Sequence, residues 1–262
     1  MIAENFIIEW QNTAPWQTSE QVEQDLVLSR AMFEIFSKKE LAERLALRGG
    51  TALHKLFLQP QHRYSEDIDL VQIQPEPIKQ TLSWMREVLE FLGKPKVKQK
   101  RSNNTLIFRF ESEIQPVQNL RLKIEINCRE HFNVLGFDRR PFSVESRWFS
   151  GSCEVVTFQL EELLGTKMRA LYQRRKGRDL YDLDRALKKL EVDTGKVLEC
   201  YRRYMDFSVK NPPSQKEFRN NMKAKLTDGE FLGDTTSLLI AGQKFDPAAA
   251  YENCFDKLIG HI

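Results

Sequence analysis

Two aspartates separated by one residue indicate the chemistry that this chain performs. Asp67 and Asp69 alternate with the aliphatic residues Ile68 and Leu70. Successive side chains of a β-strand point to opposite faces, so both carboxylates share one face while the aliphatic residues enter the core. Two carboxylates held side by side repel each other unless a cation lies between them. Because carboxylate, phosphate and water oxygens are the ligands that Mg²⁺ (or Mn²⁺) prefers, the pair predicts a site for a metal-bound nucleotide.

A glycine pair, Gly49 and Gly50, precedes these aspartates and directly follows the apolar segment Leu45–Arg48, which we expect to be a strand. Without a Cβ atom, glycine lets backbone N–H groups come close to a ligand. We expect a helix from Thr51, whose first N–H groups and positive dipole end would face an anion. The glycines and Thr51 are therefore predicted to bind nucleotide phosphates. Together with the Asp-x-Asp strand, they favour metal-dependent nucleotidyl transfer.

Four short motifs carry a resemblance to a known family. They are Gly49-Gly50-Thr51-Ala52-Leu53, Arg63-Tyr64-Ser65-Glu66-Asp67-Ile68-Asp69-Leu70, Lys167-Met168-Arg169-Ala170 and Arg178-Asp179-Leu180-Tyr181-Asp182-Leu183. The series resembles the AbiEii-type nucleotidyltransferase toxins, which include MenT-like proteins and belong to the DNA polymerase β-like superfamily. Each motif is weak evidence when taken singly, whereas the combination is specific. The resemblance covers roughly residues 45 to 187.

This resemblance implies a fold and an activity. The fold is α+β, with an N-terminal nucleotidyltransferase mixed sheet flanked by helices and a C-terminal helical bundle. The activity is transfer of a nucleoside monophosphate from a nucleoside triphosphate to an acceptor, with release of pyrophosphate. In the toxin members the implied acceptor is the 3′ end of tRNA, often with a pyrimidine donor such as CTP. The implied setting is a type IV-like toxin–antitoxin or phage-defence system with a cognate antitoxin. Nothing in the residues independently selects tRNA or CTP.

The resemblance also implies roles for residues outside the Asp-x-Asp strand. Lys167 would hold the triphosphate, because an ammonium neutralises phosphate oxygens without a fixed geometry. Asp179 and Asp182 would complete the site by orienting Lys167 or by contacting the nucleotide. Alternatively, these residues form a salt-bridge set on the helix surface, with Asp179 stabilised by the helix dipole. Ser65 would lie near the triphosphate, and it is a phosphorylation target in some relatives; as a loop serine it would instead cap a turn.

A third carboxylate and three basic residues are further candidates. In Leu120–Asn127 polar and apolar residues alternate, and Glu125 lies on the polar face, where polymerase-like enzymes place a third metal ligand or general base. The alternative is a glutamate that faces solvent. Arg48, Lys55 and Arg63 are predicted phosphate partners from their placement alone.

Composition and charge indicate an ordinary globular protein. Of the 262 residues, 41% are hydrophobic and 29% charged, and the net charge is +3. Basic residues cluster in Lys94–Arg101 and Gln173–Arg178, which would suit an RNA backbone or form solvated surface. Four dispersed cysteines indicate no zinc site or disulfide framework. Without a signal-peptide pattern or a bilayer-length apolar run, the sequence predicts a cytoplasmic protein with no membrane contact.

The periodicity of apolar residues changes near Phe158, from alternating strands to helical stripes such as that of Gln159–Arg174. We therefore expect a nucleotidyltransferase α/β catalytic domain over residues 1–158. A helical C-terminal domain over residues 159–262 is expected to contribute to the active site.

Two alternative functions remain open. The acceptor could be a small molecule or a protein side chain, and a small-molecule enzyme needs an enclosed cleft. The chain could also be a non-catalytic module that binds RNA or a partner protein. Loss of site residues would favour a module, yet Asp67, Asp69 and Lys167 are all present.

Overall fold

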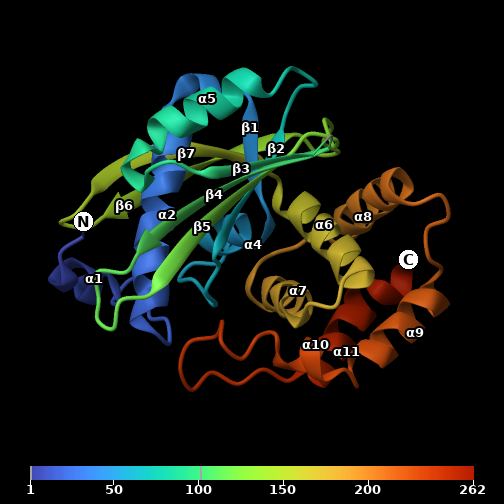
Figure 1. Ribbon diagram of the computed structural model, residues 1–262. Coiled ribbons are helices and arrows are strands. Elements are labelled where there is room, and N and C mark those ends of the chain that lie inside the picture. The colour runs from blue at the N-terminus through green and yellow to red at the C-terminus, as the bar shows by residue number, and fades with distance from the viewer. Residues whose placement is uncertain (1, 101) are drawn as a thin grey trace. The chain divides into compact units, whose positions relative to one another are not determined.

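A computed structural model describes residues 2–100 and 102–262 of the chain (Figure 1). These residues divide into two compact units. The first contains the described residues up to 133 and residues 137–158, and the second contains residues 134–136 and 159–262. Arg101, the last residue of the predicted basic segment Lys94–Arg101, lies outside the described residues.

The first unit is built on a mixed sheet, which has seven strands among the described residues in the order β3-β4-β5-β2-β1-β7-β6. The strands are β1 (Leu45–Arg48), β2 (Asp67–Gln72), β3 (Lys96–Lys100), β4 (Asn103–Glu111), β5 (Asn119–Asn127), β6 (Phe137–Glu145) and β7 (Ser150–Phe158). β2 runs parallel to β5 and antiparallel to β1, and β1 runs parallel to β7. The pairs β3–β4, β4–β5 and β6–β7 are antiparallel. The predicted strands at 45–48, 67–70 and 120–127 are confirmed.

Alternation along the central strands separates a buried face from a polar one. In β5, Leu122, Ile124 and Ile126 are fully buried, whereas the residues between them are partly exposed. Ile68 and Leu70 of β2 are buried in the same way. Burial of such aliphatic side chains stabilises the sheet by about 2 kcal/mol each. The intervening polar residues are consequently held on one rigid surface.

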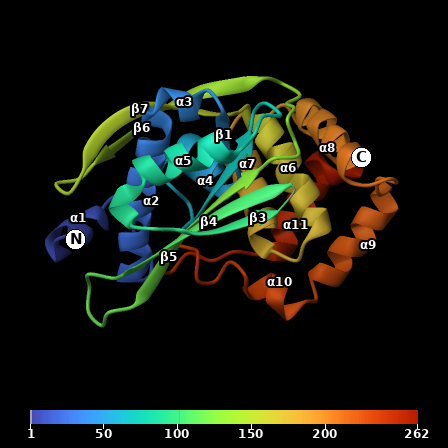
Figure 2. The same cartoon turned by 45° about the horizontal axis from the view of Figure 1, so that its top comes forward.

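Helices of the first unit cover the sheet and link its strands. They are α1 (Glu4–Trp10), α2 (Ser19–Ser37), α3 (Lys39–Ala42), α4 (Gly49–Ala52), the π-helical η1 (Leu53–Phe57), α5 (Lys79–Val88) and the 3-10 helix η2 (Glu90–Leu92). The long helix α2 packs against β5, β6 and β7, as Figures 1 and 2 show. Its start is capped by Thr18, whose hydroxyl accepts a hydrogen bond from the Gln21 N–H at 3.3 Å.

The helix after the glycine pair starts earlier than the sequence predicts. It begins at Gly49 and not at Thr51. Strand β1 ends at Arg48 in an extended conformation, and Gly49 has a φ of +78°. This conformation is costly for residues with a Cβ atom, so glycine allows the chain to turn from strand to helix without a loop. The glycine pair is therefore part of the helix.

The second unit is a helical bundle, as predicted. It comprises α6 (Leu160–Gln173), α7 (Gly177–Lys189), α8 (Thr194–Ser208), α9 (Gln215–Lys225), α10 (Gly229–Gly233), α11 (Pro247–Lys257) and the 3-10 helix η3 (Ile259–His261). α6 packs against α7 and α8, and α7 packs against α11. At Gly165 of α6, a Cβ atom would lie 2.6 Å from Cys200 Cβ of α8, so only glycine permits this close approach. Across the described residues, no helix is long and apolar enough to cross a membrane.

Candidate active site

The predicted metal-binding carboxylates lie on one face of the central sheet. In the parallel pairing of β2 with β5, Asp67 is opposite Lys123 and Asp69 is opposite Glu125. Paired residues on neighbouring strands direct their side chains to the same face. Asp67, Asp69, Lys123 and Glu125 therefore share the polar face of the sheet. We call these four residues the carboxylate cluster.

Lys123 is the basic member of this cluster. Its Nζ lies 2.7 Å from Asp67 Oδ2 and 3.8 Å from Glu125 Oε1. Burial raises the pKa of Asp67 to about 6, although the hydrogen bond and charge of Lys123 act in the opposite direction. The charge of Asp69 raises the pKa of Asp67 further. With all groups ionised, three carboxylates and one ammonium leave a net charge of −2, which attracts cations.

The glycine pair lies against this cluster. A Cβ atom on Gly49 would collide with the Asp69 carboxylate, and one on Gly50 would lie 2.5 Å from Arg63 Nη2 and 3.3 Å from Ser65 Oγ. The protein's own side chains therefore leave little space for a Cβ atom at either glycine. The close approach brings the start of α4 next to Asp69 and to the segment before β2.

Hydroxyl groups connect the start of α4 to the Asp-x-Asp strand. Thr51 Oγ1 lies 2.8 Å from Ser65 Oγ and donates a hydrogen bond of 2.5 Å to the backbone carbonyl of Asp67. Arg63 is buried, and its Nη1 donates to the Tyr64 carbonyl at 2.7 Å. Four predicted nucleotide-binding residues, Gly50, Thr51, Arg63 and Ser65, are consequently brought together beside the carboxylate cluster.

Lys55 does not join this group. Its Nζ bonds to Asp25 Oδ1 at 2.8 Å and to Ser29 Oγ at 3.0 Å, and the same Asp25 oxygen accepts from Trp10 Nε1 at 3.0 Å. Asp25 is fully buried, and a buried carboxylate needs a counter-ion. Lys55 lies on the side of η1 that meets α2, so it neutralises Asp25.

Arg48, another predicted phosphate partner, is also engaged by a carboxylate. Its Nη1 lies 2.5 Å from Glu130 Oε2. Glu130 is in turn positioned by Asn127, whose side-chain oxygen accepts from the Glu130 N–H at 2.9 Å. Arg48 is paired with Asp69 in the β1–β2 register, so this ion pair borders the carboxylate cluster.

In the second unit, Lys167 and the two predicted aspartates form a buried network. Lys167 Nζ lies 3.1 Å from Asp179 Oδ1 and 2.7 Å from Asp182 Oδ2. Arg174 adds hydrogen bonds of 2.6 and 2.8 Å to Asp179. Burial acts to raise the pKa of Asp179, but the charges of Lys167 and Arg174 lower it overall. Both aspartates are 0% exposed, so the set is a buried network that joins α6 to α7 and not a surface one.

The residues of the carboxylate cluster suit a hard divalent cation. Three carboxylates on one face provide oxygen ligands of the type that Mg²⁺ prefers. Among residues 2–100 and 102–262, no three acidic, histidine or cysteine side chains stand in an arrangement that could hold a metal ion as they are. Asp67 is held by Lys123, so binding of a metal requires the side chains to rearrange. The ligand chemistry nevertheless fits.

Comparison with known proteins identifies the family. Residues 30–256 match the family described as nucleotidyl transferase AbiEii toxin, type IV TA system. The chain belongs to this family. It is therefore a nucleotidyltransferase, and the resemblance inferred from the sequence motifs is confirmed.

Two solved structures share the fold of this AbiEii-family chain. MenT4, a nucleotidyltransferase toxin from Mycobacterium tuberculosis H37Rv, is 14% identical with a TM-score of 0.70, over 100% of this chain and 91% of MenT4. A putative nucleotidyltransferase from H. pylori is 18% identical with a TM-score of 0.53, over 90% of this chain and 92% of that one. No individually curated protein gave a match.

Sequence reasoning missed one residue of the carboxylate cluster, Lys123. The alternation in Leu120–Asn127 placed Lys123 on the same polar face as Glu125, which was the available signal. Its significance depends on the pairing of β5 with β2, which brings Lys123 opposite Asp67. The register between two strands that are far apart in the sequence cannot be predicted from the local pattern of either strand.

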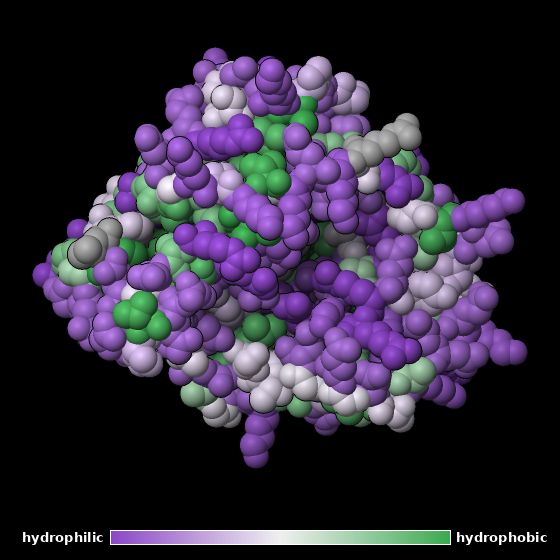
Figure 3. All heavy atoms as spheres, in the orientation of Figure 1, coloured by the Kyte–Doolittle hydropathy of each residue, from purple (hydrophilic) through white to green (hydrophobic). Residues whose placement is uncertain are grey.

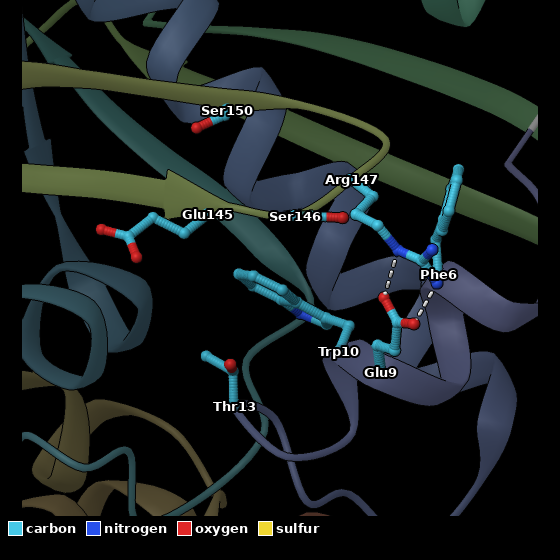
Figure 4. Close-up of a pocket in the computed structure, with 8 residues that line it drawn as sticks. All are labelled: Phe6, Glu9, Trp10, Thr13, Glu145, Ser146, Arg147 and Ser150. Atoms are coloured by element: carbon cyan, nitrogen blue, oxygen red, sulfur yellow. Dashed lines mark hydrogen bonds and ion pairs between the residues drawn. The ribbon is translucent and has the colours of Figure 1, made fainter.

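Hollows of the first unit lie away from the carboxylate cluster, and one of about 550 Å³ is lined by residues that include Gln72, Lys100 and His131. A pocket of about 510 Å³ opens between α1 and the β6–β7 hairpin, where Arg147 forms an ion pair with Glu9 (Figure 4). A neighbouring cavity of about 320 Å³ shares Trp10 and Thr13 with this pocket and is lined by Lys55. No residue of the carboxylate cluster lines any of these hollows.

Proposed function

We propose that this AbiEii-family nucleotidyltransferase is a Mg²⁺-dependent enzyme that transfers a nucleoside monophosphate to the 3′ end of tRNA. The observation that carries the proposal is the carboxylate cluster, in which Asp69 and Glu125 are direct neighbours and Asp67 follows on the same face. Mn²⁺ would serve the same ligands. CTP is the donor that we propose, following the family resemblance.

The residues of the first unit have distinct roles in this proposal. Asp67, Asp69 and Glu125 would hold the divalent cation, which would supply positive charge that stabilises the leaving pyrophosphate. The acceptor hydroxyl oxygen loses its proton to solvent and forms a bond to the α-phosphorus, the bond from this phosphorus to the β-phosphate oxygen breaks, and pyrophosphate leaves.

The start of α4 binds the phosphates of the donor in this proposal. Gly49 and Gly50 at the start of α4 offer backbone N–H groups, and the hydroxyls of Thr51 and Ser65 are held together beside them at 2.8 Å. Arg63 supplies a positive charge next to Gly50. Main-chain donors, hydroxyls and a guanidinium are the groups that bind phosphate oxygens in proteins.

Lys167 is the proposed phosphate ligand of the second unit. Its ammonium is oriented by Asp179 and Asp182, at 3.1 and 2.7 Å. Two carboxylates that hold one ammonium restrict its rotamers, so the charge is pre-organised for a triphosphate.

A row of lysines on the edge strand β3 supports a polyanionic acceptor. Lys98 pairs with Thr105 of β4, Thr105 pairs with Glu125 of β5, and Glu125 pairs with Asp69 of β2. Paired residues share a face, so Lys96, Lys98 and Lys100 lie on the face of the carboxylate cluster. All three are exposed. We call them the lysine row.

The lysine row lies about 14 Å from Asp69, which is three strand spacings. This distance suits contact with an RNA backbone whose 3′ end reaches the carboxylates. The face seen in Figure 3 is mostly hydrophilic, with apolar residues scattered over it. An exposed row of positive charge favours tRNA over a small-molecule acceptor, which needs an enclosed cleft.

The family description also supports a proposed biological setting. We infer that the protein is a toxin accompanied by a cognate antitoxin, as the type IV toxin–antitoxin family implies. A tRNA acceptor would place this activity in the cytoplasm.

The proposal is tested by incubating the protein with Mg²⁺, total bacterial tRNA and each α-labelled nucleoside triphosphate in turn. We expect label on tRNA with one preferred donor, and no label with the Asp67→Asn/Asp69→Asn variant. Label on the protein or on a small acceptor would keep nucleotidyl transfer and reject tRNA. Absence of transfer with all donors and acceptors would favour a non-catalytic binding module.

A further inference from the structure

The position of Lys123 within the carboxylate cluster has a consequence for metal binding. Its Nζ lies between two acidic side chains, 2.7 Å from Asp67 Oδ2 and 3.8 Å from Glu125 Oε1. Both partners come from the set that would hold the divalent cation. An ammonium with three N–H donors occupies the space where these carboxylate oxygens converge. A metal ion needs the same oxygens.

Asp69 differs from Asp67 in its contacts. Within residues 2–100 and 102–262, no hydrogen bond or ion pair is formed to the Asp69 carboxylate, whereas Asp67 is bound by Lys123. One ligand of the proposed cation is thus accessible, and the other is occupied. The cluster is therefore neutralised in part by a residue of the protein itself.

The Lys123 side chain is able to leave this position. It is 29% exposed, and Asp67 and Glu125 are 27% and 36% exposed. A lysine has four rotatable side-chain bonds, and its hydrated ammonium can turn into solvent while the stem remains on the sheet. A divalent ion brings twice the charge of the ammonium to the same oxygens.

We propose that Lys123 is the resident counter-ion of the carboxylate cluster, which holds Asp67 and Glu125 in the metal-free protein and must be displaced when a divalent cation binds. This inference rests on the proposed function, because it requires Asp67 and Asp69 to be metal ligands. It assigns Lys123 as a positioning residue that competes with the metal. The free metal ion consequently binds more weakly than three carboxylates alone would allow.

The test measures Mn²⁺ binding to the whole protein without nucleotide, by the electron paramagnetic resonance signal of unbound Mn²⁺. Lys123→Met keeps most of the side-chain length and removes the charge. We expect Lys123→Met to bind Mn²⁺ about tenfold more tightly than the wild-type protein. Lys98→Met is the matched control, since it removes the same charge from the same face about 10 Å away, at two strand spacings from Glu125. Its Mn²⁺ affinity should change less than twofold.

Thermal unfolding supplies a second readout. Without metal, Lys123→Met should unfold at a lower temperature than the wild-type protein, because the carboxylates of Asp67 and Glu125 are then left without their counter-ion. Saturating Mn²⁺ should raise its unfolding temperature by more than it raises that of the wild type. Lys123→Gln replaces Lys123→Met if the latter does not fold.

The outcomes separate this inference from the proposed function. The role of Lys123 would be overturned if Lys123→Met bound Mn²⁺ no more tightly than the wild-type protein does. It would also be overturned if Lys98→Met tightened Mn²⁺ binding as much as Lys123→Met does. In both cases the metal site would stand, provided that Asp67→Asn/Asp69→Asn still weakened Mn²⁺ binding. Mn²⁺ binding that is unchanged in Asp67→Asn/Asp69→Asn would reject the metal site itself, and with it the proposed function.

Discussion

Asp69 of β2 and Glu125 of β5 lie directly opposite each other in a parallel strand pair. The two carboxylates belong to segments more than fifty residues apart, and the sheet brings them to one face beside Asp67. Carboxylates on directly opposite residues of neighbouring strands repel each other unless a cation is bound between them. Lys123 supplies one positive charge in the metal-free protein. The three carboxylates therefore have the chemistry of a cation site, and Lys123 neutralises part of their negative charge.

The first prediction concerns Gly49. Gly49→Ala should lower the free energy of unfolding by about 1–2 kcal/mol because of its positive φ, and more because its Cβ atom collides with the Asp69 carboxylate. Displacement of Asp69 should reduce nucleotidyl transfer at least tenfold.

The matched control is Gly93→Ala, since Gly93 has a similar φ of +77° and no atom within 4 Å of a built Cβ. It measures the cost of a side chain at a positive φ where no steric contact is made. Urea unfolding and transfer assays on both variants make the comparison. Equal losses in both would show that contact with Asp69 is unimportant.

The second prediction separates two roles of Glu125. As a metal ligand, Glu125→Gln should raise the dissociation constant for Mn²⁺ at least tenfold, with transfer largely restored at high metal concentration. The measurement is the transfer rate as a function of Mn²⁺ concentration. A lower rate at every metal concentration, with unchanged Mn²⁺ affinity, would instead make Glu125 the general base.

The third prediction concerns the buried network of the second unit. Lys167→Met leaves the carboxylates of Asp179 and Asp182 without their shared ammonium and should cost about 3 kcal/mol of unfolding free energy. If Lys167 binds the triphosphate, the transfer rate per folded molecule should also fall by more than tenfold. Urea unfolding gives the folded fraction for this correction. A transfer rate that follows the folded fraction alone would restrict Lys167 to a structural role.

Lys225 provides a prediction for the pH dependence of stability. Its ammonium donates to the backbone carbonyls of Leu171 and Tyr172 near the end of α6. Burial lowers the pKa of Lys225 to about 8, against the charge of Asp179, which raises it. Between pH 8 and the ordinary lysine pKa, the unfolded chain binds more protons than the folded protein. This group therefore makes stability rise with pH over that window.

We expect the free energy of unfolding to rise by about 1 kcal/mol over this window. This is well below the value that corresponds to the full pKa shift of Lys225, because solvent and salt screen the charge. Urea unfolding at pH 8, 9 and 10 measures it. Lys225→Met should lack the rise. A wild-type protein that loses stability as strongly as the variant over this range would contradict the assignment to Lys225.

The fifth prediction concerns the lysine row. Replacing Lys96, Lys98 and Lys100 by glutamine should raise the KM for tRNA and reduce its dependence on salt concentration, because fewer phosphate contacts release fewer counter-ions. The KM for the nucleoside triphosphate should change little. The assay is tRNA labelling at several salt concentrations. An unchanged salt dependence would place RNA binding elsewhere on the protein.

Much of the fold followed from local sequence pattern. The alternation around Asp67 and Asp69 is a short-range signal, and so is the helical stripe after Phe158. The motifs that carried the family resemblance are likewise local. In contrast, the role of Lys123 depends on the β2–β5 register, which joins distant segments. Lys55 shows the same limit, because its partner Asp25 lies on α2, thirty residues earlier.

The central claim is that the enzyme directs the attack of an acceptor hydroxyl on the α-phosphorus of a nucleoside triphosphate. The most direct measurement compares two labelled forms of the preferred donor, one carrying the label at the α-phosphate and one at the γ-phosphate. We predict that the α-label is transferred to the acceptor, that the γ-label is released as pyrophosphate, and that Asp67→Asn/Asp69→Asn abolishes both. Transfer of the γ-label to the acceptor would show phosphoryl transfer and contradict the account.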